Sequence, residues 1–466
     1  MSPSLSEFRK PFEAAGQGHV FRHAEAQDAA AQARLAQQLA GIDLKLLKRL
    51  VDEMKQDRPV TALELDRVEP APFLALPVGP GGRRREKRAA QAGIEALTAG
   101  KVAAMVVAGG QGSRLGFEGP KGCFPIGPVS GCSLFEWHFQ KVVASRRRFG
   151  AAIPMLVLTS PANHTQTIEF LRANRWFGMP EQDVIVFPQG MLPAVDFDGR
   201  LLLEAPDALF RSPDGHGGAL LALAREGVLD ELTRRGIENI FYFQVDNPLV
   251  KVLDATFLGH HRLAESEMSS KMVLKRDPKE KVGVFARAGR RIGIVEYSDL
   301  PENLAQAVEP DGAVRFGAGN IAIHVIDVAF ARRVNEGGLR LPYHRAKKVI
   351  PCLGADGVLT RPTAPNGVKF ETFVFDALPL AKRALVVETS RAEEFSPVKN
   401  AEGEDSAATA RRDLLNLFRS WLSEAGFAAG DGAVLEIAPS FALDREEFAH
   451  KVAVERVLCD GTLWVK

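Results

Sequence analysis

The sequence predicts an α/β fold built on a buried, mixed but mostly parallel sheet. Four short apolar runs rich in β-branched and aromatic residues are bounded by turn residues: Val102–Ala108, Ile153–Thr159, Val184–Phe187 and Ile240–Val245. Helix-length segments separate them, and strands that are apolar on both faces are typical of a parallel sheet covered by helices. With 466 residues, the chain is long enough for two or three domains.

The first hundred residues differ from this pattern and predict a helical region. Ala24–Leu50 and Arg88–Leu97 are rich in helix-forming residues with helix-like apolar spacing. The run Arg83–Arg88 is strongly basic, which is typical of a solvated helix start. We therefore place a helical N-terminal region at residues 1–98 and the central α/β domain at residues 99–390.

Residues 391–466 predict a small C-terminal domain. A polar stretch follows the β run Ala384–Glu388, then a helix is expected at Thr409–Ala425 and a β-like tail at Ala433–Lys466. Val282–Tyr297, which lies within the central domain, carries glycines at positions typical of an antiparallel insertion.

Composition excludes several classes of protein. The formal net charge is +1, which argues against a nucleic-acid-binding surface over the whole chain. The four cysteines have no CxxC spacing, so a zinc site and a disulfide framework are not expected. No apolar run is long enough to cross a membrane, and the charged N-terminus lacks the apolar core of a secretory signal. We expect a cytoplasmic protein, and the sequence carries no signal for an oligomeric state.

The most informative stretch is VVAGGQGSRLGFEGPK at Val106–Lys121. An apolar strand enters a glycine-rich turn, and Arg114 and Lys121 follow. Glycines let backbone N–H groups approach an anion, and the two cations neutralise phosphate charge. Gly110, Gly112 and Gly116 give GxGxxxG, which matches neither the dinucleotide fingerprint GxGxxG nor the Walker A motif. The turn predicts a grip for a triphosphate.

This stretch resembles the signature of nucleotide-sugar pyrophosphorylases, AGGxGTRLG followed by PKG, with Ser113 in place of the usual Thr. Over about residues 90–400 the chain is similar to UDP-N-acetylhexosamine pyrophosphorylases, within the UDP-glucose pyrophosphorylase type 1 family. Further motifs follow in chain order: QGMLP at 189–193, PDGHGG at 213–218, VDN at 245–247, PKEKVGV at 278–284, VEYS at 295–298, GAGNI at 317–321, KFETFVFD at 369–376 and EFSPVKN at 394–400. The resemblance implies a Rossmann-like (GT-A-like) nucleotidyltransferase domain at residues 99–390.

The resemblance also implies an activity, which is the reversible transfer of a uridylyl group from UTP to a hexose or N-acetylhexosamine 1-phosphate. Arg114, Lys121 and Lys399 would act on the phosphates. The residues implied for UTP and uridine are Gly109, Gly110, Gly112, Gln189, Gly215, His216 and Gly217. Those implied for the sugar are Gly283, Glu296, Asn320, Phe373 and Phe375.

A metal site is expected beside the glycine-rich turn. Asp246 follows the apolar strand Ile240–Val245, which places its carboxylate at the carboxyl end of a strand. A carboxylate there is a hard oxygen ligand that suits Mg²⁺ or Mn²⁺, and the matching aspartate of the family binds the metal. Asp376 is a weaker candidate for a second ligand.

Three alternatives remain at this point. PDGHGG carries His216 where N-acetylhexosamine enzymes usually have Asn, and this favours UDP-glucose as the alternative product to UDP-N-acetylglucosamine. A non-catalytic protein that binds nucleotide sugars would have lost Arg114, Lys121 or Asp246, and all three are present. An NAD-dependent oxidoreductase is disfavoured by the spacing of the glycines.

Overall fold

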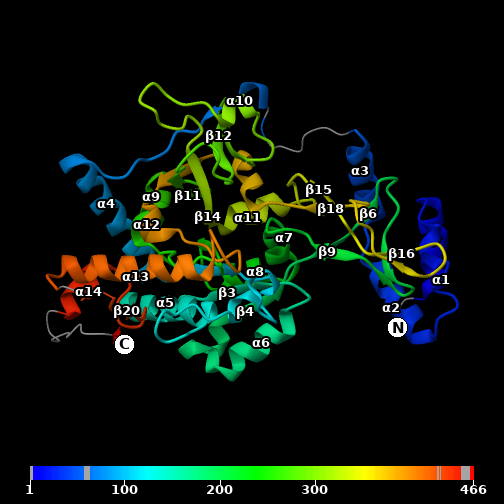
Figure 1. The fold of residues 1–466 in the computed structure, drawn as a ribbon, viewed down its shortest axis with the longest axis horizontal. Coiled ribbons are helices and arrows are strands. Elements are labelled where there is room, and N and C mark those ends of the chain that lie inside the picture. The colour runs from blue at the N-terminus through cyan, green and yellow to red at the C-terminus, as the bar shows by residue number, and fades with distance from the viewer. Residues whose placement is uncertain are drawn as a thin grey trace. The chain divides into compact units, whose positions relative to one another are not determined.

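The computed structural model of the protein describes residues 4–56, 63, 65–427, 430, 432–452 and 462–465 (Figure 1). The chain divides into two compact units, each assembled from segments that are distant in sequence. Unit 1 consists of Met1–Thr61, Gly190–Gly218 and Leu341–Val374, and unit 2 of Ala62–Gln189, Ala219–Arg340 and Phe375–Lys466. These two units differ from the three domains predicted from the sequence, 1–98, 99–390 and 391–466. The three domains stay a prediction.

Unit 2 is built on a 10-stranded sheet in the order β1-β12-β14-β10-β2-β3-β4. Off this path, β11 pairs with β14, β19 pairs with β11, and β13 pairs with β12. The strands are β1 (Glu69–Pro70), β2 (Val102–Val107), β3 (Met155–Thr159), β4 (Val184–Pro188), β10 (Asn239–Gln244), β11 (Met268–Leu274), β12 (Val284–Ala288), β13 (Arg291–Val295), β14 (Ala318–Asp327) and β19 (Ala384–Glu388). Strands β10, β2, β3 and β4 are parallel, whereas β14 is antiparallel to β10, β11 and β12. The α/β fold with a central mixed sheet is confirmed, with parallel pairing along β10, β2, β3 and β4 and also between β11 and β19.

Helices cover this sheet because its central strands are apolar on both faces. Every residue of β2 and β3 is buried. The helices of unit 2 are α4 (Gly79–Thr98), α5 (Leu134–Phe149), α6 (His164–Ala173), α7 (Gly218–Arg225), α8 (Val228–Arg234), α9 (Ala255–Leu263), α10 (Glu302–Ala305), α11 (Val328–Asn335), α12 (Arg391–Glu394), α13 (Ala407–Glu424) and α14 (Arg445–Val452). Helix α5 begins at Ser133, whose side chain accepts the N–H of Glu136, and ends at Gly150 in the left-handed conformation. These local signals explain why its bounds follow from the sequence.

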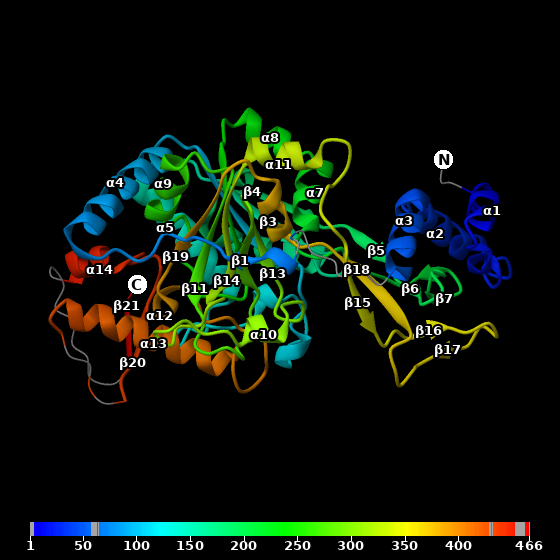
Figure 2. The same cartoon turned by 90° about the horizontal axis from the view of Figure 1, so that it is seen from above.

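Helices α4 and α9 lie side by side and touch through two glycines (Figures 1 and 2). A Cβ on Gly93 would lie 1.7 Å from the Ala255 carbonyl oxygen, and one on Gly259 would lie 1.6 Å from that of Ala89. No other residue leaves room for backbones this close. The pair places α9 and the segment before it, 245–254, against the N-terminal part of unit 2.

Unit 1 joins the N-terminal helices to two later segments of the chain. It contains α1 (Leu5–Ala14), α2 (Ala29–Ala40), α3 (Leu44–Lys55) and the strand groups β15 (His344–Lys348), β18 (Gly367–Glu371) and β6 (Val195–Asp196); β16 (Cys352–Leu353) and β17 (Leu359–Thr360); β5 (Met191–Pro193) and β9 (Arg211–Pro213); β7 (Leu203–Ala205) and β8 (Ala208–Leu209) (Figure 2). Phe12, Leu35, Val195 and Phe370 share one buried core. The buried Gln17 side chain donates to the Gly199 carbonyl and accepts the Leu201 N–H. The helical stretch predicted at Ala24–Leu50 is two helices, α2 and α3, with a break at 41–43, and apolar burial against residues 190–218 and 341–374 stabilises them. The helix predicted at Arg88–Leu97 is part of α4 in unit 2.

The C-terminal tail corrects one prediction. Helix α13 matches the expected helix, but the β-like tail Ala433–Lys466 contains helix α14 between β20 (Val434–Ile437) and β21 (Thr462–Val465). Glu446 and Glu447 lie in the first turn of α14, and His450 and Lys451 lie in its last. This arrangement suits the helix dipole. Within the described residues, none of the helices combines the length and the apolar character that crossing a membrane requires.

Candidate active site

The glycine-rich loop after β2 is folded back on itself by backbone hydrogen bonds. Lys121 N–H donates to the Gly110 carbonyl at 3.0 Å, and Gly112 N–H donates to the Gly119 carbonyl at 2.9 Å. Gly116 and Gly119 have φ of 67° and 117°, in the region that favours glycine. The Gly112 N–H is thus engaged within the loop, so its implied contact with phosphate would require this bond to open. No heavy atom lies within 4 Å of where a Cβ on Gly110 would be.

Two buried amide side chains lie against this loop. Asn163 donates from Nδ2 to the carbonyls of Ala108 (2.9 Å) and Gly110 (3.3 Å), while its Oδ1 accepts the Ser160 N–H. Gln189, the expected base reader, is also buried, and a Cβ on Gly109 would lie 3.3 Å from its Oε1. The structure thus brings together Gly109 and Gln189. It adds Asn163, which the sequence analysis missed because a lone asparagine carries no pattern.

Lys121 and Asp246 meet beside the loop. Strand β10 is parallel to β2, with Gln244 opposite Val107, so residues that follow the two strands emerge at the same edge of the sheet. Lys121 Nζ lies 3.3 Å from Asp246 Oδ2 and 3.3 Å from the carbonyl oxygen of Val398. Each of the two charged side chains is 17% exposed. An ammonium and a carboxylate therefore stand together, partly open to solvent, next to the open backbone at Gly110.

The other two implied cations are more exposed. Arg114 lies on the short 3-10 turn Ser113–Leu115 and is exposed. Lys399 Nζ lies 3.7 Å from Asp405 Oδ2, and its side chain is 51% exposed. Its backbone N–H donates to the Asp405 carbonyl. In this conformation Lys399 is paired with Asp405, and reaching a phosphate would require its side chain to leave that carboxylate.

Three of the residues implied for the sugar come together at β12–β14. A Cβ on Gly283 would lie 2.8 Å from Oε1 of Glu296, and the Gly283 carbonyl accepts the Asn320 N–H at 2.8 Å. Asn320 Oδ1 in turn accepts the N–H of Ala322, which has φ of 54°. A non-glycine residue in this conformation is uncommon and is often found at functional sites. Gly283, Glu296 and Asn320 therefore form one cluster in unit 2.

The two aromatic residues implied for the sugar, Phe373 and Phe375, belong to different units. Phe373 belongs to unit 1, where its ring stacks on His216 with centroids 5.1 Å apart and lies 4.2 Å from the ring of His344. Phe375 and Asp376 belong to unit 2, where both are buried in the 3-10 segment Val374–Leu380. Phe373 thus groups with the uridine residue His216, and His344 joins them without a prior signal in the sequence.

The segment 214–218 is held tightly against residues 372–374 within unit 1. Thr372 N–H donates to the Asp214 carbonyl (2.7 Å), and Gly217 N–H donates to the Thr372 carbonyl (2.8 Å). His216 Nδ1 accepts the Val374 N–H at 3.2 Å. Burial and the neighbouring His344 lower the pKa of His216 from 6.5 to about 4, so its ring is neutral at pH 7.

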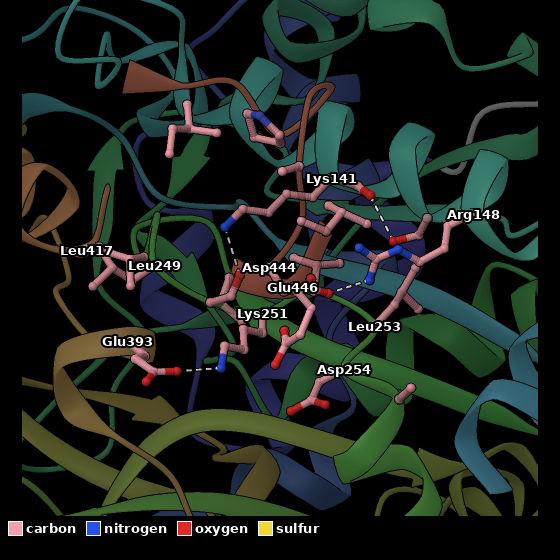
Figure 3. A pocket seen from close by; sticks show the side chains of 18 of the residues that line it. Lys141, Arg148, Leu249, Lys251, Leu253, Asp254, Glu393, Leu417, Asp444 and Glu446 are labelled. Atoms are coloured by element: carbon pink, nitrogen blue, oxygen red, sulfur yellow. Dashed lines mark hydrogen bonds and ion pairs between the residues drawn. The ribbon is translucent and has the colours of Figure 1, made fainter. Parts of the chain in front are cut away.

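A cavity of about 540 Å³ lies elsewhere in unit 2 (Figure 3). It is lined by α5, α13 and residues 248–256, including Trp137, Lys141 and Asp254. None of the residues implied for UTP, sugar or metal lines it. Among the described residues, no group of three or more His, Cys, Asp or Glu side chains is arranged to hold a metal ion.

Comparison with known proteins identifies the family. The profile of the UTP–glucose-1-phosphate uridylyltransferase family matches residues 78–446. The chain belongs to this family. It is 33% identical over 466 residues to the UDP-N-acetylglucosamine pyrophosphorylase of Saccharomyces cerevisiae, covering 96% of this chain and 97% of that protein.

Solved structures agree with this assignment. The uridine diphosphate N-acetylglucosamine pyrophosphorylase of Trypanosoma brucei has a TM-score of 0.83 and 26% identity over 99% of this chain and 98% of that one. A UDP-glucose phosphorylase from the same organism has a TM-score of 0.61 and 17% identity over 90% and 87% of the two chains. The second likeness concerns the fold alone.

Proposed function

We propose that this chain is a UDP-N-acetylglucosamine pyrophosphorylase, which makes UDP-N-acetylhexosamine and pyrophosphate from UTP and the sugar 1-phosphate. The observation that carries the proposal is the pair Lys121–Asp246, 3.3 Å apart, beside the open glycine loop after β2. The family assignment supports the uridylyl transfer. The relatives named for N-acetylglucosamine, which match nearly the whole chain, support the choice of sugar.

The reaction requires positioning and charge neutralisation more than acid–base chemistry. A phosphate oxygen of the sugar 1-phosphate attacks the α-phosphorus of UTP. The bond from that phosphorus to the oxygen bridging the β-phosphate breaks, and pyrophosphate leaves with the electron pair. Because the nucleophile is already an anion, no general base is needed. Electrostatic stabilisation by preorganised cations and N–H groups is the main contribution that the protein makes.

The residues of unit 2 divide this work. Gly109, Gly110 and Arg114 would hold the triphosphate, with Gly112 shaping the turn between them. Lys121 would neutralise charge at the α-phosphate, where the Asp246 carboxylate and the Val398 carbonyl already orient its ammonium. Lys399 would join after releasing Asp405. Gln189 would read the imide edge of uracil, since its amide has both donors and an acceptor.

A divalent cation fits this arrangement through one carboxylate. Asp246 offers a hard oxygen at the ligand edge of the sheet, and Mg²⁺ commonly takes one or two carboxylates together with substrate phosphates and water. Mn²⁺ accepts the same oxygen ligands. When bound, the ion neutralises phosphate charge. Asp376 is 3% exposed inside a 3-10 segment, so Asp246 is the stronger candidate ligand.

Sugar and uridine contacts complete the proposal. Glu296, Asn320 and the Gly283 backbone would bind sugar hydroxyl groups or the acetamide. The amide oxygen of Asn320 holds Ala322, so its NH₂ group is the part that would meet a sugar oxygen. Phe375 would pack near the sugar. The side chains of His216 and Phe373 would contact uridine, in the segment that Gly215 and Gly217 pack against residues 372–373.

The test is a pyrophosphate-release assay with UTP and each of three acceptors: N-acetylglucosamine, N-acetylgalactosamine and glucose 1-phosphates. We expect the highest kcat/KM with N-acetylglucosamine 1-phosphate. Higher kcat/KM with glucose 1-phosphate would instead support UDP-glucose synthesis, the reading that His216 favours. UTP binding with no turnover of any acceptor would indicate a non-catalytic sugar-nucleotide-binding protein.

A further inference from the structure

The segment 394–398 is attached to the residues after β10 by one buried amide. Asn247, which is 3% exposed, donates from Nδ2 to the Glu394 carbonyl at 2.7 Å. Its Oδ1 accepts the Ser396 N–H at 3.2 Å. Both the NH₂ group and the oxygen of the amide thus form hydrogen bonds with the backbone of a segment 147 to 149 residues away in the chain.

This attachment sets where two groups around Lys121 lie. Two residues beyond Ser396, the Val398 N–H donates to the Asp246 carbonyl at 2.8 Å. The Val398 carbonyl accepts from Lys121 Nζ, the same atom that contacts the Asp246 carboxylate. The register between 245–247 and 394–398 therefore determines the distance between the two acceptors that orient the ammonium.

Each partner segment is also held by contacts that do not involve Asn247. The Glu394 carboxylate accepts from Lys271 Nζ at 2.6 Å, and Ser396 Oγ donates to Asp413 Oδ2 at 2.7 Å. These anchors keep the segment folded when the amide is absent. Loss of Asn247 is then expected to shift the register by a small distance and to leave the segment in place.

The segment after β10 has its own anchors on α5. His138 Nε2 donates to the Val245 carbonyl at 2.9 Å, since that oxygen can only accept, and burial lowers the pKa of this imidazole to about 3. Lys141 Nζ donates to the carbonyls of Pro248 and Val250, and Figure 3 shows this side chain extending along the cavity wall. Asn247 thus joins two segments that are each fixed elsewhere.

We propose that Asn247 is a positioning residue for uridylyl transfer, which acts through Lys121 and Asp246 by holding segment 394–398 in register with 245–247. The inference rests on the proposed function. The side-chain amide of Asn247 contacts only backbone groups of residues 394 and 396, and the proposed function gives it no contact with a substrate. A displacement of about 1 Å at such a site typically costs up to about 100-fold in rate.

The test compares Asn247→Ala with Asn239→Ala. Asn239 is an equally buried asparagine at the other end of β10, where its Nδ2 donates to Asp327 Oδ1. We expect Asn247→Ala to lower kcat by about tenfold to 100-fold and to change the KM for UTP by less than about threefold. Asn239→Ala should lower thermal stability by a similar amount and keep kcat within about threefold of wild type. Equal kcat in the two variants would overturn the proposal.

Asn247→Asp gives a second measurement that does not depend on packing, since the side chain keeps its size. The ionised carboxylate can only accept, so it opposes the Glu394 carbonyl and kcat falls. Retention of wild-type kcat by Asn247→Asp would contradict the assigned hydrogen bonds, because the Glu394 carbonyl would then have lost its donor without effect.

Combining Asn247→Ala with Lys121→Ala separates the two proposals. If Asn247 acts through Lys121, the double variant should have the kcat of Lys121→Ala alone, whereas independent roles would multiply the two losses. A wild-type protein that releases no pyrophosphate from UTP with any of the three acceptors would refute the proposed function. Turnover by wild type with an undiminished kcat in Asn247→Ala would refute only the positioning role.

Discussion

Two glycine-rich segments of this protein have similar composition and opposite surroundings. In unit 2, a Cβ on Gly110 would meet no heavy atom within 4 Å. In unit 1, a Cβ on Gly215 would lie 2.3 Å from the Thr372 carbonyl oxygen, and one on Gly217 would lie 2.6 Å from the Phe373 nitrogen. Open space therefore lies beside Gly110, although a Cβ on Gly112 in the same loop would meet Phe117 at 2.7 Å, whereas Gly215 and Gly217 let two backbones pack together.

The difference shows that a glycine-rich motif can carry either of two physical requirements. At Gly110 the side-chain direction is open, and the carbonyl accepts hydrogen bonds from the Lys121 N–H and Asn163 Nδ2. At 215–218 the glycines are occupied by residues 372–374, so contacts with a ligand there would come from the side chains of His216 and Phe373. Changes at the two segments should therefore separate activity from stability.

The largest effect is expected for Lys121→Ala, which removes the charge beside the open loop. Turnover should fall by about 100-fold or more, because a preorganised cation is lost where charge develops. The thermal midpoint should change little, since the side chain is partly exposed. The exposed Lys45 provides a matched control, and Lys45→Ala should retain full activity. Near wild-type turnover of Lys121→Ala would remove this lysine from the mechanism.

Gly217→Ala tests the packed segment. The added methyl group would overlap the backbone of Thr372 and Phe373, and overpacking of this kind costs about 1–3 kcal/mol. Urea denaturation should show a lower midpoint for the unfolding of the variant. Unchanged stability would mean that segment 214–218 moves apart from 372–374 without cost.

Gly110→Ala is the matching substitution in the open loop. Its free energy of unfolding should change by less than about 1 kcal/mol, because the methyl group meets no neighbour. The KM for UTP should rise by about tenfold if phosphate oxygens approach this backbone. Steady-state kinetics with varied UTP measures this, and an unaltered KM would place the triphosphate elsewhere.

The smallest effect is expected for His216→Asn. It is a change in how the free energy of unfolding depends on pH. The folded-state pKa of about 4 is below the ordinary 6.5, so the unfolded chain binds more protons between these values. Stability is therefore complete above pH 6.5 and declines as the pH falls toward 4. The Asn variant should lose less stability over this interval, by about 1 kcal/mol for a half-buried ring. Urea midpoints at pH 7.5 and 5 measure the change, and parallel behaviour would contradict it.

Some of the site was predictable because its signals are local. The apolar strand β2, the glycines after it and the carboxylate of Asp246 after β10 are read from neighbouring residues. Parallel pairing of the two strands then follows from their apolar character and brings Lys121 and Asp246 to one edge. The helical tail segment α14 had local charge signals as well, but these were outweighed by the β-rich composition around them.

Other parts depended on contacts between distant segments. Asn163, Asn247 and His344 have no distinguishing neighbours in the sequence. Asn163 contacts Gly110, 53 residues away, Asn247 contacts Glu394, 147 residues away, and His344 contacts Phe373 in the loop after β18. The composition of unit 1 from three segments likewise follows from apolar burial around Phe12 and Phe370. The hydrophobic pattern of a sequence predicts which residues are buried. Only the folded structure shows which residues they pack against.

The sequence alone determined the α/β class and the family, because periodicity and ordered motifs are properties of neighbouring residues. The tertiary structure decided which glycines face open space and which are filled by backbone. It also decided that Lys399 pairs with Asp405 and that Asn247 joins two remote segments beside Lys121. These outcomes depend on the positions of atoms that the chain brings together only on folding, and a hydrogen bond requires those positions to within a few tenths of an ångström.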